Sequence, residues 1–175
     1  MSLLELLGLA RSPDSPSDIE GVRTIVKSLG SLDPDRARYI AAFSYILSRV
    51  AHVDQQVSAE ETAAMERSIA AEGRLPESQA KLVVEIVKAQ SVLFGGVDDF
   101  LVTRELANQI SHEDKLALLH CLFAVSAADR HVATAEDNEI RRISRELRIE
   151  HADYIAVRSA HREHLGVLKR DTQPE

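Results

Sequence analysis

Two pairs of acidic residues have the types and spacing to bind a metal cation. Asp54 is followed seven residues later by Glu61, and Asp129 is followed seven residues later by Glu136, 75 positions further along the chain. Four neighbouring carboxylates cannot all stay ionised without raised pKa values or a counter-cation, and their hard oxygen ligands favour Ca²⁺ or Mg²⁺. Neither segment has the spacing and central glycine of an EF-hand. We therefore expect one site shared by two acidic loops.

The same acidic residues have a simpler structural interpretation. Ser58 and Glu61 form a capping-box sequence, and Glu136 lies where a helix dipole favours an anion. Asp54 and Asp129 could accept turn hydrogen bonds from nearby backbone N–H groups. Spacing alone leaves capping and cation binding open.

Histidines beside the aspartates would admit a different metal. His52 and His131 flank the two aspartates, and imidazole suits a transition metal, although exposed loop histidines are the simpler interpretation. Arg130, next to Asp129, could instead neutralise the second loop from within the chain.

The helices on either side of the loops must bring these residues together. Apolar residues spaced i, i+3, i+4 and i+7 precede each loop, as one face of a helix requires. The matching sets are Phe43, Ile46, Leu47 and Val50 before the first loop and Leu118, Cys121, Leu122 and Val125 before the second. After the loops, Met65 matches Ile140. One residue is then lost, so that Ile69 matches Ile143 and Leu75 matches Ile149 at an offset of 74. The chain thus contains a duplicated helix, acidic loop, helix unit.

Apolar periodicity and start and stop signals predict an all-α protein with about eight helices in a compact bundle. No stretch is typical of a strand. We expect N-terminal helices in 1–32, a helical domain in 33–168 with repeat units at about 39–90 and 114–164, and a polar tail in 169–175. The helices are expected at residues 2–10, 16–29, 34–50, 58–73, 76–93, 97–110, 112–125, 134–147 and 152–164, with Gly73 ending the helix that follows the first loop.

The paired acidic loops resemble those of the TerB-like tellurite-resistance family, which includes a domain of membrane-anchored J-domain co-chaperones. The likeness rests on Phe100–Asn108, on the run from Leu116 to Asp129 and on Glu139-Ile-Arg-Arg-Ile-Ser, and it covers roughly residues 35–165. It implies an acidic divalent-cation site at Asp54, Glu61, Asp129 and Glu136 and a role in stress-linked assemblies rather than catalysis. The family has glycine after each aspartate, where this chain has Gln55 and Arg130.

Composition narrows the class of partner. The 175 residues carry a net charge of -7, no Trp and only seven Phe and Tyr, which disfavours nucleic acid and anionic lipid. The leucine-rich N-terminus is too short to span a bilayer and lacks a basic leader. Cys121, the only cysteine, is expected to be a small buried hydrophobe. We expect a cytoplasmic protein without a membrane span.

Nothing else in the sequence indicates catalysis. His120 lies in an apolar helix and is expected to be a core or groove histidine. The segment from His161 to His164 is one residue short of an inverted zincin motif and is expected to be exposed. No organic cofactor is expected.

The sequence therefore favours a non-catalytic, cation-binding interaction module with an unidentified protein partner. A metal-free helical adaptor is the alternative. A hydrolytic or redox enzyme using a transition metal with His52 or His131 is a third hypothesis.

Overall fold

The computed structural model describes residues 16–51, 59–89, 99–127 and 134–164. Within these ranges the chain forms eight α-helices, one 3₁₀ turn and no strand, which confirms the predicted all-α class. The helices are α2 (Pro16–Gly30), α3 (Pro34–Ser48), α4 (Ala59–Glu72), α5 (Glu77–Lys88), α7 (Asp99–Gln109), α8 (His112–Ser126), α9 (Thr134–Glu146) and α10 (His151–Ala160), and the turn is η1 (Arg162–His164). The predicted helix at 2–10 and the two acidic loops, 52–58 and 128–133, lie outside the described residues.

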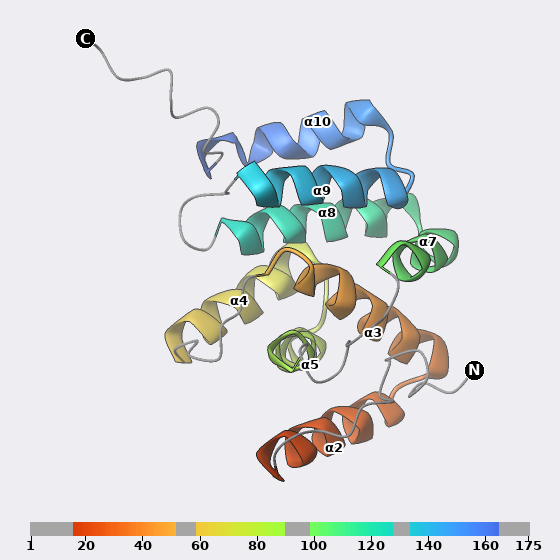
Figure 1. Ribbon diagram of the computed structural model, residues 1–175, viewed down its shortest axis with the longest axis vertical. Helices are drawn as coiled ribbons and strands as arrows, with labels where there is room; N and C mark the ends of the chain where they lie inside the picture. Colours follow the sequence, from red (N-terminus) through yellow and green to blue (C-terminus); the bar gives the residue numbers. More distant parts are fainter. Residues whose placement is uncertain (1–15, 52–58, 90–98, 128–133, 165–175) are drawn as a thin grey trace.

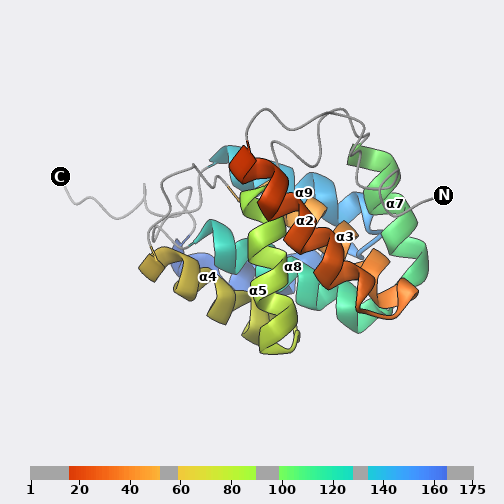
Figure 2. The same ribbon diagram turned by 90° about the horizontal axis from the view of Figure 1, so that it is seen from below.

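The helices pack in two groups that share one core. In Figure 1, α8, α9 and α10 form one layer, with α9 and α10 both packed on α8, while α3 and α4 each pack on α5 beneath it. Contacts between α4 and α8 join the groups, and α7 contacts both α3 and α9. Seen from below in Figure 2, α2 lies across α3 and α5. None of the described helices is long and apolar enough to cross a membrane.

The central helix is α8, which contacts α3, α4, α9 and α10. Apolar residues surround its axis, and a helix that is apolar on all sides is stable only when neighbours cover all sides. Its buried residues are Ala117, Leu118, Leu119, Cys121, Leu122, Phe123, Val125 and Ser126. The equivalent helix of the first unit, α3, is also extensively buried.

The matched apolar sets of the two units all lie in the core, as predicted. None of the eight side chains is more than 6% exposed. They are Phe43, Ile46 and Leu47 on α3, Val50 two residues after its end, and Leu118, Cys121, Leu122 and Val125 on α8. Two helices begin with a side-chain cap. Asp33 accepts from the N–H of Asp35 at 2.9 Å, and Ser111 accepts from the N–H of Asp114 at 3.1 Å.

The second helices of the two units end in the same backbone conformation. Arg74 follows α4 with φ 52°, and Arg148 follows α9 with φ 56°. In each case the N–H of the next residue, Leu75 or Ile149, reaches back five positions to a carbonyl, at 3.2 Å and 2.9 Å respectively. This is the Schellman closure of a helix end. The two arginines are 74 positions apart, the offset predicted from the apolar residues around them.

One predicted helix end is confirmed with an unexpected capping residue, and another differs from the structure. Gly73 follows the end of α4 as expected, but Arg74 adopts the left-handed conformation that usually selects glycine. The helix expected over 152–164 is α-helical only as far as Ala160 and then changes to η1. The part of the 76–93 helix beyond residue 89 is not described.

Gly73 is required by close packing rather than by a left-handed backbone. A Cβ there would lie 2.6 Å from the Ile69 carbonyl oxygen and 3.1 Å from Cζ of Phe43. Gly73→Ala is therefore expected to lower the free energy of unfolding by about 1–3 kcal/mol, measured by urea denaturation. Gly21→Ala is the matched control, because a Cβ at Gly21 on α2 meets nothing within 4 Å. The control should raise stability by about 0.5–1 kcal/mol, and equal stabilities of the two variants would contradict the close approach.

The Cys121 thiol is expected to be inert in the folded protein. It is fully buried in α8, and burial raises the pKa of the thiol. A sulfhydryl reagent at pH 8 should therefore label Cys121 only as fast as the protein unfolds, and at once in urea. An Ala156→Cys variant on the exposed face of α10 provides the control, since its added thiol should react immediately. Rapid labelling of the wild-type chain would contradict this burial.

Candidate functional site

The structure describes part of the predicted cation site. Asp54 and Asp129 lie outside the described residues. Glu61 is the third residue of α4 and Glu136 is the third residue of α9, so both glutamates lie in the first turn of a helix, as predicted. Glu136 is half-buried and makes an interaction within the chain. The convergence of the four carboxylates therefore stays a prediction.

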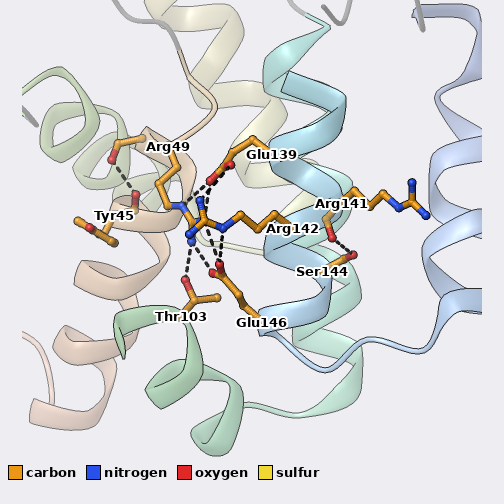
Figure 3. A network of polar contacts seen from close by, with 9 residues as sticks. Tyr45, Arg49, Thr103, Glu139, Arg141, Arg142, Ser144 and Glu146 are labelled. Atoms are coloured by element: carbon orange, nitrogen blue, oxygen red, sulfur yellow. Dashed lines mark hydrogen bonds and ion pairs between the residues drawn. The ribbon is translucent and has the colours of Figure 1, made fainter. Parts of the chain in front are cut away.

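A buried ion-pair network surrounds Arg49, the C-cap residue of α3, and joins it to α9 (Figure 3). The Arg49 Nε atom donates to Oε1 of Glu139 at 2.9 Å, and its Nη1 atom donates to Oε2 of Glu146 at 2.7 Å. The same Nη1 atom donates to the Thr103 hydroxyl at 2.8 Å. Arg142 approaches from the outer side, with its Nε atom 3.2 Å from Oε1 of Glu146. One arginine thus connects α3, α7 and α9.

The charged side chains of the network are so deeply buried that each needs an oppositely charged partner. The side chains of Arg49 and Glu146 are each 6% exposed, and that of Glu139 is 27% exposed. Burial alone would lower the pKa of the Arg49 guanidinium, but hydrogen bonds to Glu146 and Glu139 outweigh it and the pKa lies above its usual value. The two arginines and two glutamates sum to no net charge. This balance permits burial, because an unpaired ion in a protein interior costs several kcal/mol.

A second ion pair holds the first turn of α9 against α10. Arg158 donates from Nη2 to Oδ2 of Asp137 at 2.7 Å and from Nε to Oδ1 at 3.0 Å. The Tyr154 hydroxyl lies 3.4 Å from the same Oδ1 atom. The side chains of Arg158 and Asp137 are 24% and 13% exposed. Asp137, the residue next to Glu136, therefore joins α9 to α10 through an ion pair.

These contacts define how the loop-flanking helices are arranged. Arg49 is the C-cap of α3, and the first acidic loop begins three residues later. Glu139 lies three residues after Glu136, so the two glutamates share one face of α9. The ion pair between Arg49 and Glu139 therefore places the end of the helix entering the first loop beside the helix leaving the second.

Comparison with known proteins identifies the family. The family model described as tellurite resistance protein TerB matches residues 38–159, a segment whose sequence includes both acidic loops. The chain belongs to the TerB family. The resemblance predicted from the acidic loops is thereby confirmed. No curated protein and no solved structure matches the chain.

The described residues of this TerB-family chain do not by themselves form a multidentate metal centre. Within the described ranges, no group of three or more His, Cys, Asp and Glu side chains is placed to hold an ion. The carboxylates of Glu139 and Glu146 are paired with the Arg49 guanidinium. The cation site expected at the acidic loops therefore stays a prediction.

The Arg49 network was not predicted from the sequence, although the sequence contains a signal for it. Arg49 adjoins the apolar set that ends at Val50, and Glu146 lies between the buried residues Ile143 and Leu147. Charged residues at inward-facing positions far apart in the sequence indicate a buried ion pair. Periodicity identified their apolar neighbours but could not pair the charges.

Breaking the network from one side is expected to destabilise the TerB domain. Arg49→Met leaves Glu146 buried beside Glu139 with only Arg142 to neutralise them, and should cost about 3–5 kcal/mol in urea denaturation. The double variant Arg49→Met with Glu146→Leu should recover part of that loss, because the most buried carboxylate is removed with its partner.

Lys81→Met provides a control for loss of an exposed ion pair. Lys81 pairs with Glu77 at 2.7 Å, but the side chains are 53% and 79% exposed. No measurable loss of stability is expected from this variant. An equal, small effect of Arg49→Met would show that the buried network contributes no more than a surface pair.

Proposed function

We propose that this TerB-family protein is a non-catalytic, divalent-cation-binding interaction module linked to tellurite resistance or a related stress response. Its site is shared by the two acidic loops and takes Ca²⁺ or Mg²⁺. Asp54 and Glu61 contribute carboxylates from the first unit, and Asp129 and Glu136 contribute them from the second. These hard oxygen donors match the ligand preference of both cations.

The observation that carries the proposal is the contact between Arg49 and Glu139. A site assembled from two loops needs the helices flanking those loops to be held together before the ion arrives. The Arg49 guanidinium supplies such a contact between the end of α3 and the face of α9 that carries Glu136. The matching Schellman ends of α4 and α9 support a symmetric origin of the two halves.

Cation occupancy would act on a protein partner through helix packing. The first loop follows the end of α3, and the second loop precedes the start of α9. Because α3 and α9 belong to different helix groups, an ion between the loops would favour one relative position of those groups. The partner is a protein, through which peripheral contact with a membrane would be indirect, and no nucleic acid is involved. We assign the protein to the cytoplasm because its only cysteine is a buried free thiol.

A metal-free adaptor is the second candidate, favoured by the pairing of acidic side chains on α9. Asp137, Glu139 and Glu146 all form ion pairs with arginines of the same chain. Gln55 and Arg130 also occupy the positions where the family has glycine. In this alternative the loops cap helices, and the helical surfaces bind the partner without an ion.

Thermal melts after chelation distinguish the two candidates. Ca²⁺, Mg²⁺, Mn²⁺ and Zn²⁺ are added separately to the wild-type chain and to the Asp54→Asn, Asp129→Asn double variant. A ligand at one hundred times its dissociation constant adds about 2.7 kcal/mol, which raises Tm by about 5–10 °C for a chain of this size. We expect this shift with Ca²⁺ or Mg²⁺ in the wild-type chain and its loss in the double variant.

A matched variant controls for the change in net charge. Asp35→Asn with Asp153→Asn removes the same charge from positions outside the loops and should retain the cation-dependent shift. Calorimetry should give one bound ion per chain, and Asp54→Asn alone should abolish it if the site is shared. The absence of a shift with every ion would reject the cation site in favour of the adaptor.

A further inference from the structure

The fold brings together two histidines that are 41 residues apart in the sequence. His120 lies on α8, and His161 is the C-cap of α10. The Nδ1 atom of His120 is 3.2 Å from the Nε2 atom of His161, a hydrogen bond whose donor depends on which ring carries the proton, and both side chains are half-buried. The sequence alone predicted a core or groove position for His120 and an exposed position for His161, with no contact between them.

The distance between the two nitrogens suits a shared metal ion. Zn²⁺ binds imidazole nitrogens at about 2.0–2.1 Å, so two nitrogens on a tetrahedral ion lie about 3.3–3.4 Å apart. The observed 3.2 Å differs from this spacing by only a small movement of either ring. The ring centroids are 5.4 Å apart and the ring planes are inclined at 56°, so the rings do not stack face to face.

Neighbouring aromatic residues hold the pair in this arrangement. The Phe123 ring stacks on the His161 ring at 5.5 Å with an angle of 17° between the planes. Phe123 is fully buried and also contacts the Tyr154 ring at 6.3 Å, so the same residue packs α8 against α10. Because packed helices fix both imidazoles, little conformational entropy is lost when an ion binds.

We propose that His120 and His161 form a second metal site, separate from the acidic loops, that takes an imidazole-preferring transition-metal ion, with Zn²⁺ as the best match. Water completes the coordination of the ion. Neutral imidazole is a ligand for Zn²⁺, whereas Ca²⁺ and Mg²⁺ require oxygen donors. Bound Zn²⁺ would fasten the end of α10 to α8. This inference stands apart from the function proposed for the loops.

The direct test uses the wild-type chain, stripped of metal by chelation and titrated with Zn²⁺. Long-range ¹H–¹⁵N spectra of the histidine rings should show shifts at Nδ1 of His120 and Nε2 of His161. Zn²⁺ should also raise Tm, by about 5–10 °C at one hundred times its dissociation constant, whereas Ca²⁺ should leave these ring nitrogens unchanged. Unshifted ring nitrogens under saturating Zn²⁺ would overturn the proposal, whether or not any variant folds.

Variants then assign the ligands by calorimetry. His120→Ala and His161→Ala should each weaken Zn²⁺ binding at least tenfold, and the double variant should bind no more weakly than the weaker single variant, because both side chains hold one ion. His112→Ala and His151→Ala remove exposed histidines from the same two helices and should retain full binding. A His52→Ala, His131→Ala variant should also retain it. Loss of binding in that last variant alone would move the site to the acidic loops and reject the His120–His161 pair.

Discussion

The structure depends on the neutralisation of one buried cation. The Arg49 guanidinium is enclosed by helices of both units and is held by two glutamates and a threonine hydroxyl. A charge in that position is tolerated only if opposite charges and hydrogen-bond acceptors surround it, so the network has strong geometric requirements. A nonpolar contact between α3 and α9 would permit sliding, whereas a guanidinium donating to two carboxylates specifies one relative position. The proposed function, a site shared by two loops, would require that specificity.

The duplication gives the two units matching helix packing, but the two units are not equivalent. The apolar faces of α3 and α8 match, and α4 and α9 end with arginines in the same left-handed conformation. The ion network has no counterpart related by the repeat, because Ala124 occupies the position on α8 that matches Arg49 on α3. Common ancestry of the units therefore accounts for the shared packing, while the charged contact between them is a feature of one side only.

The fold also separates two kinds of ligand chemistry. The acidic loops offer carboxylate oxygens, which suit hard cations, whereas the pair of His120 and His161 offers two nitrogens held by aromatic packing. The histidine pair lies between α8 and α10, both within the second unit. In the proposed function, an ion at the acidic loops would influence the relative position of the two units. An ion at the histidines would influence only the attachment of α10.

The sequence by itself determined the all-α class, the order of the described helices, the apolar faces of α3 and α8 and the membership of the TerB family. These properties follow from local periodicity, capping residues and a motif repeated along the chain. The location of Glu61 and Glu136 in first helical turns was predictable for the same reason. Only the tertiary structure decided that Arg49 pairs with Glu139 and Glu146 and that His120 meets His161. Those pairs are separated by 41 or more residues, and their side chains meet only after whole helices have packed. Periodicity assigns a residue to a helix face, but it carries no information about which distant face will cover it.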